Sequence, residues 1–396
     1  MASVMAWLDS TREEQRAARE LIALFSQPEG RDELGIGPIR DAFSDLLFPG
    51  TSVLQTRARY YLFIPWCYTT GRAAHRSGLA NAESGRTQER ELIVALKNSP
   101  DQDKAGLIGA RAGVHVQNLP SQLYWNGMRH YNIRTDPGDI GSLTASLDDF
   151  DGATELTSRA PAEWNQTIPE PPDGFPTDVP SCFAMSYEEA SWLRDRIVAT
   201  TEGTLLAHLL EQDDPIDDAL APWEAADEND FEPLPHARLF SCVMYGGTLL
   251  YNLALAQRCA DLGFERHAGM IDEYADLLQQ WSEKFLEPSR AEIASWDLLH
   301  MWQLVRSARA TVPPATRQFV EAWIDTLNRG ADPLTDRDAR QLIENRERRK
   351  GAQSRLHNDK LLAVWSGASG TGGLTYRWFN VKGIVTDIKR GLDAGS

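Results

Sequence analysis

The stretch RDELGIGPIRDAFSDLLFPGTSVLQTRARYYLFIPWCY, residues 31–68, carries the clearest fold signals of the chain. Pro38 suits the first turn of a helix, because its missing N–H needs no partner there. Apolar residues then recur at helical spacing up to Leu47. Pro49-Gly50 ends that helix, and a second one becomes almost wholly apolar over 60–66. The stretch therefore predicts two helices joined at a Pro-Gly turn, the second in the core of the N-terminal half.

Charged residues are dense in the same stretch, and they stand beside apolar ones. Such groups can form a buried ionic network, which fixes geometry more than it adds stability. They can equally line a catalytic pocket, where burial and neighbouring charges shift pKa values. We favour the structural interpretation and keep a polar pocket as the alternative for Arg31, Asp32, Arg40, Asp41, Asp45, Arg57 and Arg59.

The composition is that of a soluble globular protein. Of the 396 residues, 42% are apolar and 24% are charged, and the formal net charge is −17. A field this negative repels phosphate, which argues against a protein that coats nucleic acid non-specifically but leaves room for a local basic patch. The four cysteines stand singly, without a C-x-x-C pair, which favours reduced and buried thiols over disulfides or zinc ligands.

The sequence motifs indicate neither a metal ion nor a cofactor. The eight histidines lack H-E-x-x-H or another paired spacing, and the chain has no Walker A motif and no G-x-S-x-G elbow. The N-terminus lacks the cationic and apolar segments of a signal peptide. The apolar run at 60–68 is shorter than the roughly 20 residues of a membrane span. We therefore expect a cytoplasmic protein without membrane contact, metal or cofactor.

Helical periodicity dominates the chain and predicts a mainly α fold. A multi-helix N-terminal unit is expected over residues 1–147. Six prolines and few aliphatic residues mark 148–180 as a linker or a long surface excursion. A larger helical domain is expected over 181–335. Inside its most apolar helix, Gly246-Gly247 would let another helix approach closely.

Residues 103–134 have some features of a helix-turn-helix. A short helix at 103–112 would end at a glycine, and a further helix would follow at 120–131. In a transcriptional regulator the later helix would read DNA and would have to be exposed. Trp125 and Met128 indicate a buried helix instead, so ordinary helical packing is the preferred interpretation.

The last segment, residues 336–396, has a different character. A glycine-rich loop at 366–373 could cradle a phosphate or serve as a flexible turn. Residues 374–381 read as a strand and 384–392 as a helix, which predicts a small C-terminal α/β element. The cations of this segment are either solvated and paired along a helix or placed to contact a phosphate backbone. The candidate nucleic-acid contacts are Arg346, Arg348, Arg349, Lys350, Arg355, Arg377, Lys389 and Arg390.

Asp387 and Lys389 have the D-x-K spacing of many magnesium-dependent nucleases, in which a carboxylate holds the ion and the lysine polarises water. Such tripeptides arise by chance in a chain this charged, and the segment reads as a helix. A divergent metal-dependent nuclease or other phosphodiester hydrolase is therefore the alternative interpretation rather than the leading one.

Several motifs make the chain resemble an uncharacterised bacterial family, a domain of unknown function. The signature RDELGIGPIRDAFSDLLFPGTS at 31–52 carries the resemblance, together with QTRARY at 55–60 and LTYRW at 374–378. Such proteins resemble components of anti-phage defence loci that also encode helicases and phospholipase-D-like nucleases. The resemblance implies protein partners of those types and assigns no catalytic residue.

The leading expectation is a non-enzymatic binding or scaffold subunit of a bacterial anti-phage defence complex. Its partners would be proteins such as helicase or nuclease subunits, and DNA is a further candidate ligand of the basic C-terminal segment. An enzyme, in the form of the divergent hydrolase, is the competing expectation.

Overall fold

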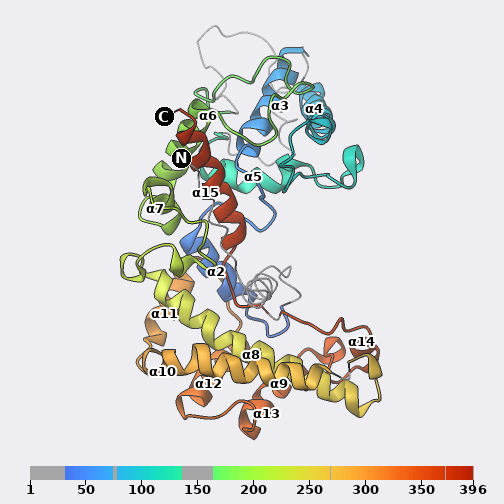
Figure 1. Cartoon of the computed structure of the whole chain (residues 1–396), viewed down its shortest axis with the longest axis vertical. Coiled ribbons are helices and arrows are strands. Elements are labelled where there is room, and N and C mark those ends of the chain that lie inside the picture. Colours follow the sequence, from blue (N-terminus) through green and yellow to red (C-terminus); the bar gives the residue numbers. More distant parts are fainter. Residues whose placement is uncertain (1–31, 75–77, 136–163, 268, 371, 396) are drawn as a thin grey trace, which may run out of the picture. The chain divides into compact units, whose positions relative to one another are not determined.

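The computed structural model describes residues 32–74, 78–135, 164–267, 269–370 and 372–395 (Figure 1). Across these ranges the chain is built from helices and connecting turns, and its one backbone pairing outside helices and turns is an isolated bridge between Arg134 and Trp164. The prediction of a mainly α fold is therefore confirmed.

The chain divides into two units, each assembled from segments far apart in the sequence. Unit 1 comprises residues 1–44 and 220–376, and unit 2 comprises 45–219 and 377–396. Helix α2 (Gly37–Leu47) contains residues of both. This division differs from the four consecutive segments predicted, because helices distant in sequence pack together within each unit.

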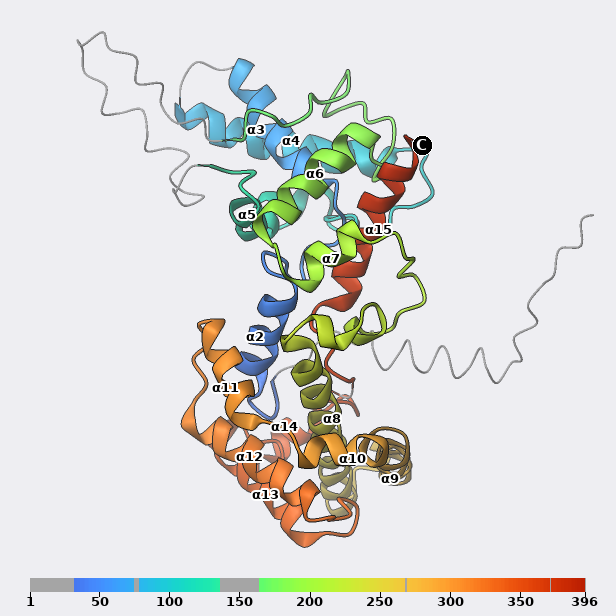
Figure 2. The ribbon, with the colours of Figure 1, turned by 90° about the vertical axis from the view of Figure 1, so that its left-hand side faces the viewer.

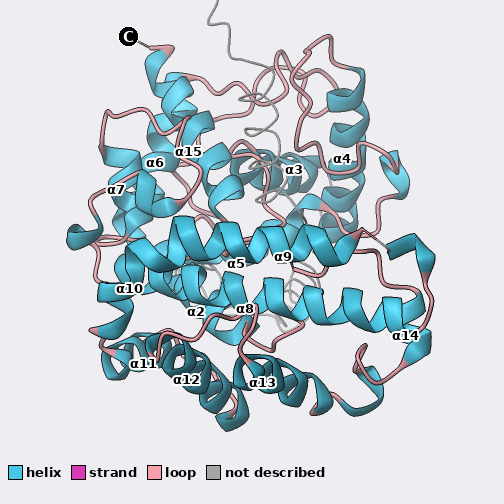
Figure 3. Cartoon of the chain, turned by 60° about the horizontal axis from the view of Figure 1, so that its bottom comes forward, coloured by secondary structure: helices cyan, strands magenta, loops and turns pink. Residues whose placement is uncertain are grey.

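Unit 1 is organised around the long helix α8 (Pro233–Asp261), which is buried nearly all round. Helix α9 (Met270–Trp281) runs alongside it (Figure 3). The remaining helices of the unit surround this pair: α10 (Glu287–Ala294), α11 (Leu298–Ser307), α12 (Pro314–Asn328), α13 (Arg337–Arg348) and α14 (Asp359–Ala363). A helix as uniformly apolar as α8 is stable in water only when neighbours cover it, which explains its central place.

The glycine pair of α8 allows the close approach that the sequence predicts. A Cβ atom on Gly246 would lie 2.6 Å from Cε2 of Trp281 and nearer still to two other atoms of that ring. Trp281 is buried, and its indole N–H donates to the Cys242 carbonyl at 2.9 Å. The missing side chain at Gly246 therefore makes the room that the Trp281 ring of α9 occupies.

The DELGIG motif at 32–37 forms a turn that starts α2. The Asp32 carboxylate accepts hydrogen bonds from the Ile36 and Gly37 N–H groups, both at 2.7 Å, and so caps the helix start. Gly35 has φ of +67°, a conformation that glycine adopts without strain. The Arg346 guanidinium lies against Gly35 and donates to the Leu34 carbonyl at 2.7 Å. The motif thus fastens the start of α2 to helix α13.

Unit 2 holds α3 (Tyr60–Ala74), α4 (Gly78–Asn98), α5 (Pro120–His130), α6 (Tyr187–Thr200), α7 (Leu205–Glu211) and α15 (Trp378–Asp393). Helix α3 packs against α4 and α5, and α15 packs against α6 and α7 (Figure 2). The apolar residues 60–64 are all buried, so the prediction of a core helix at this position is confirmed.

The described part of the proline-rich segment packs onto unit 2. The Trp66 indole N–H donates to the Pro169 carbonyl at 2.7 Å. Phe175 stacks on Phe63, with ring centroids 6.1 Å apart, and meets the Trp66 ring edge-on. Between the two predicted alternatives, these contacts favour a packed excursion over a linker.

The predicted C-terminal α/β element is wrong, since residues 374–381 form no strand. Tyr376 and Arg377 take positive φ values of +53° and +68°, which interrupts an extended chain, and helix α15 begins at Trp378. The buried residues Trp378, Val381, Val385 and Ile388 recur at helical rather than alternating spacing.

The predicted helix-turn-helix also does not form. Residues 103–112 are a series of turns, followed by the short 3₁₀ segment Gly113–His115. Of the two residues that indicated a buried helix, Met128 of α5 is fully buried and Trp125 is partly buried. A recognition helix would need the buried face for DNA.

Candidate functional site

The charged residues that the sequence groups at 31–59 go to separate partners. Arg31 lies outside the described residues. Asp32 caps α2, as described above. Arg40 and Asp41 form an ion pair at 2.9 Å in which the Asp41 side chain is mostly exposed. In unit 1, therefore, the predicted set does not combine into one polar pocket.

In unit 2 the remaining three residues of the set each join distant segments. Asp45 accepts from Arg377 at 2.7 Å. Arg59 pairs with Glu189 of α6 at 2.9 Å, and both side chains are buried. A buried pair of this kind fixes the position of one segment on another, because removing either partner leaves an unpaired charge.

Arg57 makes the most elaborate of these connections. Its Nε and Nη2 atoms both donate to the Asp387 carboxylate at 2.9 Å, and Nη1 donates to Asp103 at 2.9 Å. Its guanidinium also lies 4.3 Å from the centre of the Phe183 ring. Burial lowers the pKa of Arg57, but the bonds and charges of the two carboxylates outweigh it, so the pKa lies above its ordinary value.

A hollow of about 440 Å³ opens beside this ion pair. Helix α15 lines one side of it with Phe379, Lys382, Gly383, Thr386, Asp387 and Arg390. The other side is formed by Thr56, Arg57 and the turn residues around Gly106. The hollow brings together Arg57, Asp387 and Arg390, which the sequence placed in three different hypotheses, and it is the candidate site of unit 2.

The D-x-K pair does not converge on a metal-binding geometry. The Asp387 carboxylate is 7% exposed, and its oxygens receive the two bonds from Arg57 and one from the Ala58 N–H at 3.0 Å. Lys389 stands two residues further along α15 and donates instead to the Asp214 carbonyl at 2.9 Å. Across the described ranges no group of three or more histidine, cysteine, aspartate or glutamate residues is placed to hold a metal ion.

The predicted nucleic-acid contacts separate into internal and exposed residues. Arg346 is bound to the DELGIG turn, and Lys350 and Arg355 pair with Glu33. Arg377 and Lys389 have the partners given above. The side chains that the structure leaves exposed are those of Arg348, Arg349 and Arg390, the first two in unit 1 and the third in unit 2.

Unit 1 contains a buried ionic cluster that the sequence reasoning missed. Lys350 Nζ lies 2.8 Å from Glu33 and 2.7 Å from Glu347, and Arg355 also pairs with Glu33. Glu347 is fully buried and accepts the Arg355 N–H at 2.6 Å. Burial raises the pKa of Tyr251, whose hydroxyl donates into the same cluster. Helical spacing alone places Glu347 on a charged surface helix, so only the tertiary fold reveals this burial.

The glycine-rich loop is held from α8 rather than left open. The Asn252 side chain accepts the Ser369 N–H at 2.9 Å and donates to the Ser369 carbonyl at 2.8 Å. Tyr274 donates to the Gly367 carbonyl at 2.6 Å. These bonds fix the position of the loop, and they engage one of the backbone N–H groups that an anion would need, that of Ser369.

A second unexpected cluster is a directional chain of hydrogen bonds in unit 1. The Trp296 indole N–H can only donate, and it lies 2.8 Å from Nδ1 of His236, so the proton of that imidazole sits on Nε2. Nε2 then donates to Nδ1 of His300 at 3.3 Å, and Nε2 of His300 donates to Glu232 at 2.8 Å. These hydrogen bonds can form only when His236 is neutral, because a protonated ring would face the indole N–H with another N–H.

Protonation of His236 is therefore expected to cost stability. Burial, followed by the charge of His300, lowers the pKa of His236, while Asp297 and Glu232 act in the opposite direction. Because the pKa of His236 is lower in the folded protein, the neutral imidazole contributes stability in full above the pKa of the unfolded chain, about 6.5. This stability is lost as the pH falls below that value. We expect the free energy of unfolding of the wild type, measured in urea, to fall relative to that of His236→Gln between pH 7.5 and 5.5, by up to about 1 kcal/mol. Parallel pH profiles of the two proteins would contradict this.

Glu89 is a third buried titratable group without a sequence signal. It is fully buried in α4 and accepts from the Ser121 N–H at 2.7 Å and the Ser121 hydroxyl at 2.8 Å. Burial raises its pKa to about 7, against the hydrogen bonds from Ser121 and Tyr68. Because Ser121 stands in the first turn of α5, Glu89 acts as a cap for that helix from a neighbouring one.

Helix α8 is long and apolar enough to cross a membrane, with a mean hydropathy of 1.4 over its most apolar window. However, 83% of that window is buried within the fold. Burial of this extent is a property of the core helices of soluble proteins.

The family model DUF6361, described as a family of unknown function, matches residues 2–390. No curated protein and no solved structure is similar enough to the chain to match it. The resemblance to an uncharacterised family is confirmed by the first comparison, which assigns no role to any residue.

Proposed function

The chain belongs to this family of unknown function, and we propose that it serves as a non-enzymatic binding subunit of a cytoplasmic multi-protein assembly, of the kind that anti-phage loci encode. Its partners would be proteins such as helicase or nuclease subunits, together with nucleic acid. The proposal rests on the exposed arginines of residues 298–355 in unit 1, a segment that includes helices α11 to α13.

This segment has a net charge opposite in sign to that of the whole chain. Residues 298–355 contain eleven lysine and arginine residues against seven carboxylates, in a protein of net charge −17. Three of the cations, Arg346, Lys350 and Arg355, are used internally. We define the arginine surface by the exposed members Arg306, Arg309, Arg317, Arg329, Arg337, Arg348 and Arg349.

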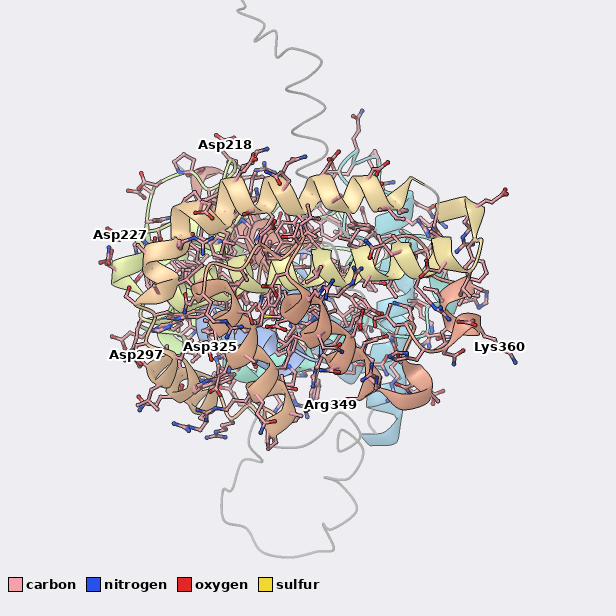
Figure 4. The ribbon with its side chains drawn as sticks, turned by 90° about the horizontal axis from the view of Figure 1, so that it is seen from below. Asp218, Asp227, Asp297, Asp325, Arg349 and Lys360 are labelled. Carbon is pink, nitrogen blue, oxygen red and sulfur yellow. The ribbon has the colours of Figure 1, made fainter. Side chains whose placement is uncertain are left out.

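The chemistry of these side chains suits phosphate. Lys350 is the only lysine among the eleven cations, so every exposed member is an arginine, whose planar fork binds phosphate oxygens in pairs. Figure 4 shows Arg349 and Asp325 at the outside of unit 1. Carboxylates such as Asp325 interrupt the positive field, which fits a contact of limited extent and a dependence on protein partners for tight binding.

The competing hydrolase hypothesis gains no support from the contacts of its motif. Asp387 would have to give up Arg57 before it could hold a magnesium ion, and Lys389 points to a different partner. An ion needs carboxylate oxygens that are not already bound to a guanidinium.

The proposal predicts salt-dependent binding of short DNA through Arg348 and Arg349. We expect the double variant R348Q/R349Q to bind DNA more weakly. Its plot of log affinity against log salt should also be less steep by about 2, since each phosphate contact contributes roughly 0.9 to the steepness. Fluorescence anisotropy of a labelled duplex and a labelled single strand across a salt series measures this slope. Lys350 is left intact, because it holds Glu33 and Glu347 together.

The matched control is R194Q, which removes an arginine from α6 of unit 2. It should leave the slope unchanged. Absence of DNA binding by the wild type at low salt, or equal slopes for all three proteins, would remove nucleic acid from the proposed function.

A further inference from the structure

The hollow beside α15 has a row of donor groups along one side. Lys382, Thr386 and Arg390 stand four residues apart on the helix and therefore project from the same face, one turn after another. Gly383 lies in the same lining and adds no side chain, so the hollow stays open between Lys382 and Thr386. A cavity of about 440 Å³ lies within the size range of small-molecule sites.

The acidic groups of the hollow are already engaged. Asp387 is neutralised by the two bonds from Arg57. Asp103 accepts from Arg57 through one carboxylate oxygen and from the Ala105 N–H, at 3.3 Å, through the other. Arg57 offsets one of these two negative charges, and with Lys382 and Arg390 the lining as a whole carries one net positive charge.

The donor groups, in contrast, can still form further hydrogen bonds. Within the described part of the chain, neither the exposed Arg390 guanidinium nor the Thr386 hydroxyl has a hydrogen-bond partner. Lys382 donates to the Asp217 and Ala219 carbonyls at 2.8 and 3.0 Å, which leaves one of the three ammonium protons. Phe379 and Ala105 add apolar surface to the same hollow.

We infer that this hollow binds a small phosphomonoester. Arg390, Thr386 and the third proton of Lys382 hold the phosphate oxygens, and the organic part of the ligand rests against Phe379 and Ala105. The Arg57–Asp387 pair forms a neutral wall that keeps α15 in place beside the turn at Gly106. This inference is independent of the arginine surface, which belongs to the other unit.

Isothermal titration with inorganic phosphate, AMP and adenosine tests the inference. We expect saturable binding of AMP, weaker binding of phosphate and none of adenosine, with ligand concentrations up to about 10 mM so that dissociation constants near 1 mM are covered. R390Q should weaken AMP binding at least tenfold, because a charge-assisted bond to phosphate is lost. R348Q/R349Q should bind AMP like the wild type, which separates this site from the proposed nucleic-acid contact.

A second variant, Gly383→Leu, fills the hollow without touching any charge. A Cβ on Gly383 would meet no atom closer than the Thr56 carbonyl oxygen at 3.6 Å, so the fold tolerates a side chain there. We expect unchanged thermal unfolding and lost AMP binding. The inference is wrong if no probe binds saturably, if adenosine binds as well as AMP, or if R390Q and Gly383→Leu both retain wild-type affinity.

Discussion

Replacing Gly246 by alanine is expected to lower the free energy of unfolding by about 3 kcal/mol, near the upper end of the usual cost of overpacking a core. The added methyl group would overlap the Trp281 ring, which is buried and held by its bond to the Cys242 carbonyl. The ring cannot move aside without losing that bond and its packing against α8.

The neighbouring glycine provides the matched control. A Cβ on Gly247 would lie 3.5 Å from the Trp323 ring, an ordinary van der Waals distance. Gly247→Ala is therefore expected to leave stability unchanged or raise it by up to about 1 kcal/mol, since alanine is the better helix former. Urea unfolding of both variants followed by circular dichroism measures the contrast. Equal midpoints would show that α9 does not pack on α8 through Gly246.

A loss of about 3–5 kcal/mol is expected for Asp387→Ala, the usual cost of breaking a buried ion pair by removing one partner. The change leaves the largely buried Arg57 guanidinium without its two bonds to Asp387 and the Ala58 N–H without an acceptor. Asp103 still pairs with Arg57, but it is largely exposed and therefore makes up only part of the lost interaction.

Asp393→Ala is the control for this prediction. Asp393 is an exposed carboxylate on the same helix, and its removal should change stability by no more than about 0.5 kcal/mol. Chemical denaturation of the two variants and the wild type gives the comparison. If Asp387→Ala unfolds at the wild-type midpoint, Asp387 does not hold α15 in place and its role has to lie elsewhere.

The helices were largely predictable because apolar periodicity and helix-ending glycines are local signals. Gly246-Gly247 and the apolar run at 60–66 were interpreted correctly on that basis. The strand predicted at 374–381 was wrong, because alternation over a few residues competes with the helical spacing that continues from Trp378 to Ile388.

The site residues were harder to predict, since their partners lie far away in the sequence. Arg57 and Asp387 are 330 residues apart, and neither has a local pattern that indicates the other. The burial of Glu347 and the chain through His236 and His300 depend on which helix faces pack together. The dense charges of the sequence thus indicated structural ion pairs. Only the three-dimensional structure distinguishes the exposed cations from those that form such pairs.

A double-mutant cycle on Arg57 and Asp387 tests most directly whether the dense charges of this chain hold the fold rather than carry out catalysis. Unfolding free energies of the wild type, Arg57→Ala, Asp387→Ala and the double variant are measured in urea, with magnesium-dependent DNA cleavage assayed on the same samples. We predict a coupling free energy of at least about 2 kcal/mol between the two residues, as for groups in direct contact, and no cleavage by any of the four proteins. Additive effects within about 0.5 kcal/mol, together with cleavage by the wild type that Asp387→Ala abolishes, would contradict it.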